Sequence, residues 1–233
     1  MAHWKKITGG LTGISAGSRS NVWGVNSEGK IYRFTNDDAT PWHGVPGGLT
    51  DISAAADGTV WGVNANAEIY RYTGDQGTGG HWKKIPGGLV RISAGSRSNV
   101  WGVNSEGKIY RFTNDDATPW HGVPGGLTDI SAAADGTVWG VNANAEIYRY
   151  TGDQGTGGHW KKIPGGLVKI SAGSRSNVWG VNSQGQIYRF TNDDATPWHG
   201  VPGGLTDISA AADGTVWGVN ANAEIYRYTG DQP

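Results

Sequence analysis

The chain has 233 residues, no cysteine, and 19 basic against 20 acidic residues, for a net charge of −1. This balance provides no broad electrostatic attraction to nucleic acid or anionic lipid, and the lack of cysteine excludes disulfides and thiolate chemistry. No apolar run is long enough for a membrane span or resembles a secretory signal, so we expect no membrane insertion and a cytoplasmic location. Forty glycines and 12 tryptophans beside 3 phenylalanines favour short strands and turns over helices.

The sequence repeats itself. The segment HWKK occurs three times at a spacing of 78 residues, and the first two copies of this unit differ at three positions. Each unit also splits into two similar halves, because six tryptophans follow one another at alternating spacings of 38 and 40 residues: Trp4, Trp42, Trp82, Trp120, Trp160 and Trp198. A period near 40 residues is typical of propeller blades or helical arrays.

Each half unit predicts four short strands. In the half unit that begins at Leu49, LTDISAA is the first strand, Asp57 and Gly58 form a hairpin turn, and TVWGVNA is the second strand. EIYRYT and HWKKIPG follow as the third and fourth strands. The prediction is therefore an all-β, six-bladed β-propeller of four-stranded antiparallel blades, with pseudo-threefold symmetry from 78-residue double blades.

We expect one domain over residues 1–233. Its blades are expected at approximately 11–47, 49–87, 89–125, 127–165, 167–203 and 205–230, with residues 3–9 completing the last one. The chain starts with a WKKI strand that belongs after an IYRYT strand, and it stops where the next such strand is due. The N-terminal strand should therefore close the ring against the C-terminal strand.

A family resemblance follows from these segments. The pattern of W-x-x-I/V-P-G-G-L, I-S-A, V-W-G-V-N and I-Y-R resembles the tectonin repeat of six-bladed propeller lectins, and it covers nearly the whole chain. The resemblance implies a multivalent lectin that recognises glycans, including O-methylated sugars on foreign cells. The WD type of propeller matches less well, because Trp is never followed by Asp here.

The tryptophans fall into two sets of six. We expect the inner set, in the VWGVN strand, to be buried between blades: Trp23, Trp61, Trp101, Trp139, Trp179 and Trp217. The outer set, which begins the last strand of each blade, has two readings. An outer indole either stacks on the apolar face of a sugar ring or fills the gap between blades at the rim: Trp4, Trp42, Trp82, Trp120, Trp160 and Trp198.

Arginine and asparagine also recur in every blade. The arginines that follow the repeated Tyr either bind sugar hydroxyls or form surface ion pairs with Asp, and we favour the ion pairs: Arg33, Arg71, Arg111, Arg149, Arg189 and Arg227. The asparagines that end the second strand are expected to cap turns: Asn26, Asn64, Asn104, Asn142, Asn182 and Asn220.

Alternate blades differ in their first hairpin turn, which reads GSRSN in one class and AADGT in the other. An arginine of the first class facing an aspartate of a neighbouring blade would form a polar pair around a sugar hydroxyl, with solvated turns as the alternative. The candidate residues are Arg19, Arg97 and Arg175 with Asp57, Asp135 and Asp213.

Catalysis is not expected. The adjacent carboxylates Asp37 and Asp38 read as turn formers, since two neighbouring loop residues do not flank a glycosidic bond as glycosidases require. No histidine pair has metal-ligand spacing, and no nucleophile elbow occurs. We therefore expect no enzyme, no catalytic residue, no metal and no cofactor, and glycans as partners.

Two further interpretations remain beside the lectin. Near-identical units are also typical of an engineered symmetric scaffold that retains no ligand, or of a recent duplication. A protein-interaction propeller would need a distinctive patch on one face, which repetition disfavours. The repeat is also compatible with oligomers, because a 78-residue piece would leave strand ends unpaired outside a closed ring.

Overall fold

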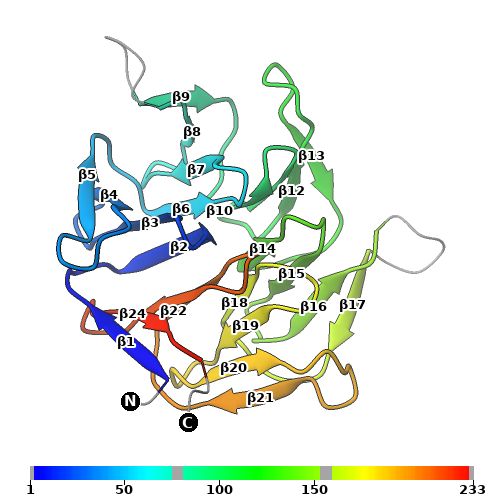
Figure 1. Cartoon of the computed structure of the whole chain (residues 1–233). Coiled ribbons are helices and arrows are strands. Elements are labelled where there is room, and N and C mark those ends of the chain that lie inside the picture. Colours follow the sequence, from blue (N-terminus) through cyan, green and yellow to red (C-terminus); the bar gives the residue numbers. More distant parts are fainter. Residues whose placement is uncertain (1–2, 75–80, 153–158, 231–233) are drawn as a thin grey trace.

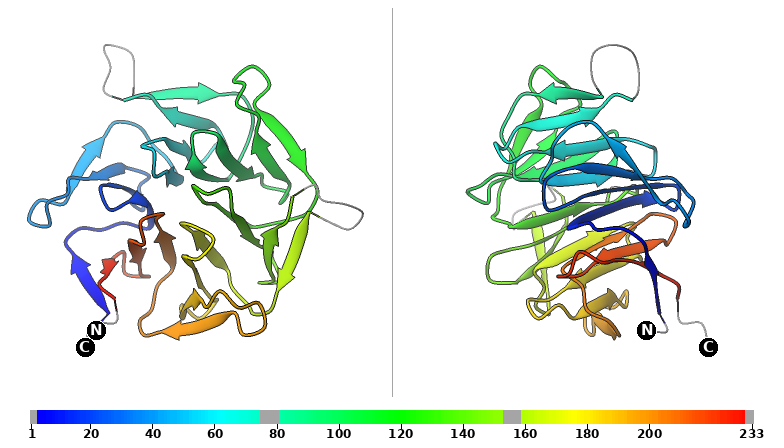
Figure 2. Two further views of the ribbon diagram at one scale, coloured as in Figure 1. Left: turned by 45° about the vertical axis from the view of Figure 1, so that its right-hand side comes forward. Right: turned by 90° about the vertical axis from the view of Figure 1, so that its left-hand side faces the viewer.

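The computed structural model describes residues 3–74, 81–152 and 159–230, and these ranges contain strands and turns but no α-helix. The strands form six four-stranded antiparallel sheets, which surround a central axis as blades (Figures 1 and 2). The predicted all-β, six-bladed propeller is confirmed. Residues 75–80 and 153–158, which the expected second and fourth blades include, lie outside the described residues.

Each blade has its four strands in order from the central axis outward. The first, innermost strands are β2 (Gly13–Ser18), β6 (Asp51–Ala54), β10 (Arg91–Ser96), β14 (Asp129–Ala132), β18 (Lys169–Ala172) and β22 (Asp207–Ala210). The second strands are β3 (Asn21–Val25), β7 (Val60–Val63), β11 (Asn99–Val103), β15 (Val138–Val141), β19 (Val178–Val181) and β23 (Val216–Val219). The third strands are β4 (Ile31–Phe34), β8 (Ile69–Tyr72), β12 (Ile109–Phe112), β16 (Ile147–Tyr150), β20 (Ile187–Phe190) and β24 (Ile225–Tyr228). The fourth, outermost strands are β5 (Trp42–Val45), β9 (Trp82–Ile85), β13 (Trp120–Val123), β17 (Trp160–Ile163), β21 (Trp198–Val201) and β1 (Trp4–Ile7).

The ring closes where the two ends of the chain meet. Strand β1 pairs antiparallel with β24, with Trp4 opposite Tyr228 and Ile7 opposite Ile225. Figure 1 shows β1, in blue, beside the red C-terminal strands. This confirms the predicted closure by the N-terminal strand. We number the blades 1 to 6 from the sheet β2–β5 onward, so that blade 6 consists of β22, β23, β24 and β1.

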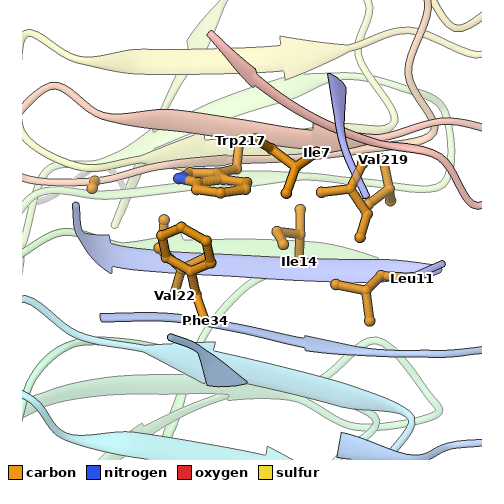
Figure 3. Close-up of a cluster of buried hydrophobic side chains, with 10 residues drawn as sticks. Ile7, Leu11, Ile14, Val22, Phe34, Trp217 and Val219 are labelled. Carbon is orange, nitrogen blue, oxygen red and sulfur yellow. The ribbon is translucent and has the colours of Figure 1, made fainter. Parts of the chain in front are cut away.

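The hydrophobic core lies between neighbouring blades. Each inner tryptophan is at most 1 % exposed, which confirms their predicted burial. Between blades 6 and 1, Trp217 packs above Phe34 and Val22, beside an aliphatic group that includes Leu11 and Val219 (Figure 3). Burial of these large side chains joins each blade to the next, since apolar surface removed from water contributes about 25 cal/mol per Å².

Strand direction gives the propeller two unlike faces. The hairpin turns after the first strands and the loops after the third strands lie on one face, which we call the hairpin face, because antiparallel strands alternate in direction. The turns after the second strands and the connections between blades lie on the other, which we call the connection face. There Asn26 accepts hydrogen bonds from the backbone N–H groups of Glu28 and Lys30 at 3.0 and 2.9 Å, and equivalent asparagines do the same, which confirms the predicted caps.

Two glycine positions allow the blades to approach closely. A Cβ atom at Gly17 would lie 2.2 Å from the carbonyl carbon of Ala55 in the next blade. Gly9, with a φ of +135°, lies against the indole of Trp42, and a Cβ atom there would be 2.7 Å from Nε1. Only glycine fits at these contacts, so the repeated glycines set the spacing of the ring.

Candidate functional site: three grooves on the hairpin face

The described residues of the hairpin face form three equivalent grooves. They lie at the junctions of blades 2 and 3, 4 and 5, and 6 and 1, with empty volumes of about 1400, 1750 and 1740 Å³ that include open solvent. Each groove is bounded by the first hairpin turn of both blades and by the loop after the third strand of the second blade. At the junction of blades 2 and 3, the lining includes Asp57, Thr59, Tyr72, Arg97 and Phe112.

In each groove the candidate arginine and aspartate are hydrogen-bonded to each other. The donor is the backbone N–H of the arginine and not its guanidinium. The N–H of Arg97 donates to Asp57 Oδ2 at 2.7 Å, and the N–H of Thr59 donates to Oδ1 at 3.0 Å. Partial burial opposes ionisation of Asp57, yet these hydrogen bonds hold its pKa below the usual value. The pairs Arg175 with Asp135 and Arg19 with Asp213 have the same geometry at 2.7 Å.

The guanidinium groups of these three arginines remain available to a ligand. Arg19, Arg97 and Arg175 are exposed, and within residues 3–74, 81–152 and 159–230 their side chains form no hydrogen bond or ion pair. Each groove therefore contains a carboxylate fixed by backbone donors and, next to it, a guanidinium whose donors face solvent.

A second arginine in each groove is already paired. Arg71 donates from Nη1 and Nη2 to the two oxygens of Asp116, both at 2.8 Å, and Lys83 Nζ lies 2.6 Å from Asp116 Oδ2. Hydrogen bonds from Arg71, which has the larger effect, and from Lys83 lower the pKa of Asp116 to about 2. The same ion pairs join Arg149 and Lys161 to Asp194, and Arg227 and Lys5 to Asp38. At these three arginines the expected ion pair with Asp is confirmed.

The outer tryptophans do not line the grooves. Their indole N–H groups donate to backbone carbonyls of the preceding inter-blade connection, as Trp120 does to Pro86 at 2.9 Å and Trp82 does to Pro46 at 2.9 Å. Trp120 also packs against Trp61 and Phe112, behind the groove wall. The structure therefore places the outer set at the rim between blades, apart from the predicted Arg and Asp residues: Trp4, Trp42, Trp82, Trp120, Trp160 and Trp198.

The aromatic residues that line the groove were not predicted from the sequence, and of these Tyr72 is partly exposed while Phe112 is only 5 % exposed. Tyr72 and Phe112 end the third strands of blades 2 and 3, and both border the groove. Phe112 stands opposite Trp120 in the strand register. The alternation of IYRY and IYRF along the chain was the available signal. Tyr150 with Phe190, and Tyr228 with Phe34, occupy the same places in the other grooves.

The inner tryptophans differ between the two blade classes. In blade 1 the indole N–H of Trp23 donates to Asn21 Oδ1 at 2.8 Å. Trp101 donates to Asn99 and Trp179 to Asn177 in the same way. In blade 2 Thr59 stands where blade 1 has Asn21. The buried Nε1 atoms of Trp61, Trp139 and Trp217 have no hydrogen-bond partner among the described residues. The alternation of NVWGVN and TVWGVN along the chain was the available signal, and this difference was not predicted from the sequence.

The connection face carries a ring of charges around the axis. It consists of the first residues of the six innermost strands, and we call it the axial ring: Gly13, Asp51, Arg91, Asp129, Lys169 and Asp207. Each aspartate accepts a backbone N–H bond from the next blade, for example from Ile14 to Asp207 at 3.1 Å. Burial raises the pKa of Asp207 to about 6, although Lys169 and the Ile14 N–H act in the opposite direction.

The described residues contain neither a metal-binding cluster nor a membrane-spanning helix. No group of three or more His, Asp or Glu residues in these ranges is arranged to hold a metal ion. No helix long and apolar enough to cross a membrane occurs in them.

The geometry defines a six-bladed propeller with three repeated polar grooves, and comparisons with known proteins give the family. The tectonin domain profile matches residues 1–120 and 112–233. The chain therefore belongs to the tectonin family. No curated protein matches the sequence.

Solved structures show the same fold at low sequence identity. The chain is similar to the WD40 β-propeller domain of Doa1, with a TM-score of 0.66 and 11 % identity over 98 % of this chain and 96 % of that one. It is also similar to YCF48 from Cyanidioschyzon merolae, with a TM-score of 0.61 and 13 % identity over 99 % and 100 %. A structure of YCF48 bound to D1 peptide gives a TM-score of 0.60 and 18 % identity over 98 % and 83 %. At these identities the likeness describes the fold.

Proposed function

We propose that this tectonin propeller is a multivalent carbohydrate-binding protein whose three grooves each hold one sugar of a glycan. The observation that carries the proposal is the groove itself, repeated three times with the same residues. Each groove combines an exposed guanidinium, a fixed carboxylate and an aromatic border. Sugars present hydroxyl groups that pair with such donors and acceptors, and C–H faces that pack on aromatic rings.

Binding suits these grooves better than catalysis. Asp57 is held ionised by two backbone N–H groups, and Asp116 is held ionised by Arg71 and Lys83. A retaining or inverting glycosidase needs one carboxyl group protonated near neutral pH, and both of these have lowered pKa values. The groove carboxylates are therefore suited to accepting hydrogen bonds from a ligand.

Repetition would compensate for weak single sites. A shallow, wet groove is expected to bind one sugar with a Kd around millimolar, about −4 kcal/mol. Three grooves share the hairpin face, so they can meet one glycan-covered surface together. Their avidity would exceed single-site affinity by roughly 10² to 10⁴. The expected ligands are glycans on foreign cells, and O-methylated sugars are the first ligands to test.

A glycan array of the labelled protein, with O-methylated mannose and fucose among unmodified sugars, tests the proposal. Calorimetry then measures affinity and stoichiometry for each hit. The test variant replaces Arg19, Arg97 and Arg175 by alanine, and the control replaces the exposed Ser27, Ser105 and Ser183 of the connection face by alanine. We expect the arginine variant to lose at least tenfold in affinity and the serine variant to bind as the parent does.

The alternative is a symmetric scaffold that retains no ligand, and the near-identity of the three 78-residue units favours it. A folded protein that binds nothing on the array would support the scaffold and contradict the lectin.

A further inference from the structure

The buried indole N–H of the inner tryptophan has a hydrogen-bond acceptor in one blade class and none among the described residues in the other. At the junction of blades 1 and 2, Asn21 accepts the indole N–H of Trp23 at 2.8 Å and donates to the Ala55 carbonyl of the next blade at 2.8 Å. One side chain thus satisfies the indole and ties two blades together. Asn99 and Asn177 do the same at the two equivalent junctions.

The three grooves lie at the other junctions, where threonine replaces this asparagine and the described residues offer the indole no acceptor. Thr59 is shorter than asparagine, and its side chain hydrogen-bonds Asp57. Trp61 is 0 % exposed, and its Nε1 has no partner among the described residues. A buried donor left without an acceptor costs about 1–3 kcal/mol, so native proteins rarely leave one unpaired. Here it is left unpaired three times, always at a groove.

The indole lies directly beneath groove residues. The Arg71 guanidinium carbon is 5.3 Å from the centre of the Trp61 ring, and the Phe112 ring centre is 5.0 Å from it. Both of these residues line the groove, as does Thr59, which precedes Trp61 by two residues in the same hairpin. In the equivalent junction, Figure 3 shows the Trp217 nitrogen at the end of the ring away from Leu11 and Val219. The donor is therefore not directed into the aliphatic part of the core.

We infer that the indole N–H groups of Trp61, Trp139 and Trp217 donate a hydrogen bond to an oxygen of the bound sugar, so that the chain binds three sugars and not six. This inference rests on the proposed function. The ligand group that reaches the indole must be a slender acceptor, such as a hydroxyl or ether oxygen. Trp23, Trp101 and Trp179 take no part, because asparagine already satisfies their indoles.

The position two residues before the inner tryptophan alternates between asparagine and threonine, and this alternation suggests the substitution to test. Thr59→Asn, Thr137→Asn and Thr215→Asn place in the groove blades the residue that the other blades carry at the same position. The new amide is expected to accept the indole N–H and to fill the space that the sugar oxygen would use. Matched controls are Thr50→Asn, Thr128→Asn and Thr206→Asn, which make the same chemical change at exposed positions on the connection face.

Calorimetry with the best sugar from the array gives the first measurement. We expect three sites per chain for the parent and the control, two for the single Thr59→Asn variant, and at least a tenfold loss of affinity for the triple groove variant. Six sites in the parent, or three intact sites in a folded triple groove variant, would overturn the inference and leave the lectin function standing. Absence of any sugar binding by the parent would overturn the proposed function and this inference together.

Indole N–H resonances give a second measurement on the unmodified protein, which does not depend on a variant that folds. Adding sugar should shift the indole signals of Trp61, Trp139 and Trp217 and leave those of Trp23, Trp101 and Trp179 in place. A shift of the second set alone, or of neither set at saturating sugar, contradicts the inference.

Discussion

The two faces of the propeller use the same 78-residue repeat in opposite ways. On the hairpin face the described residues of the three copies are identical, and three equivalent grooves result. Within residues 3–74, 81–152 and 159–230, every position at which the copies differ belongs to the connection face: 8/86/164, 12/90/168, 13/91/169, 28/106/184 and 30/108/186. Among the described residues, the face whose proposed task needs three equal sites thus keeps strict threefold identity, and the connection face does not.

Groove aspartates and two aspartates of the axial ring also have pKa values shifted in opposite directions. Asp38, Asp116 and Asp194 at the grooves have pKa values of about 2, because arginine and lysine donate to them. In the axial ring, burial raises the pKa of Asp51 and brings that of Asp207 to about 6. Asp207 and Asp51 stand on either side of Gly13, where the equivalent blades supply Arg91 and Lys169. The two aspartates with raised pKa values are thus the ones beside the position that has no side-chain cation.

The largest effect is expected from the junction asparagines. Asn21→Ala would leave the Trp23 indole unpaired and remove one of the two hydrogen bonds that the Ala55 carbonyl accepts, at a cost of about 2–4 kcal/mol in the free energy of unfolding. Thr59→Ala at the equivalent place in blade 2 should cost under about 1 kcal/mol, because the Trp61 indole is already unpaired. Urea unfolding of both variants measures the contrast, and equal losses would refute the assigned difference between junctions.

A smaller effect is expected from the groove ion pairs. Asp38→Asn weakens contacts to Arg227 of β24 and Lys5 of β1, which hold the ring closed, and should cost about 1 kcal/mol after allowance for solvent screening. The folded pKa of Asp38 lies below its unfolded value of 3.8, so this contribution is present above pH 3.8 and is lost as the pH falls through about 2. Unfolding measured from pH 7 to pH 2 should show the parent and the variant converging; a constant gap would contradict this cause.

The axial ring should respond with the opposite sign. Asp207 has a raised folded pKa, so its contribution to stability is present below pH 3.8 and is lost as the pH rises through about 6. Gly13→Lys supplies the missing cation and should stabilise the fold by about 1 kcal/mol at pH 7, the equivalent of roughly one pKa unit. The gain should vanish below pH 4. A gain that is equal at both pH values would point to backbone entropy at Gly13 instead.

The smallest effect is expected from the exposed turns of the connection face. Glu28 with Lys30 and Glu106 with Lys108 form ion pairs at 2.7 Å, while blade 5 has Gln184 and Gln186 in their place. Installing Gln184→Glu and Gln186→Lys together should leave the melting temperature unchanged within error, because exposed pairs are screened by water. A clear rise in melting temperature at low salt would show that these turns matter more than their exposure indicates.

Much of the fold could be predicted from the sequence because the same local sequence pattern occurs in all six blades. The strand residues, the Asp57 and Gly58 turn, the capping by Asn26 and the closure by β1 all depend on contacts within one blade or on the order of strands. The burial of Trp23 and its equivalents followed from the same alternation. The sequence left open whether Arg97 pairs with Asp57 or both lie in solvated turns, and in the structure the two meet through the backbone N–H of Arg97.

Only the tertiary structure decided which side chains share a groove. Tyr72, Arg97 and Phe112 come from two blades, and the twist between the sheets brings them together while it carries Trp120 behind the wall. The unpaired indole of Trp61 likewise became visible only when every neighbour of its nitrogen was known. The sequence by itself determined the blade, because a blade is held by local strand pairing. The packing of one blade on the next determined the candidate site, because its residues lie on separate strands that only ring closure sets side by side.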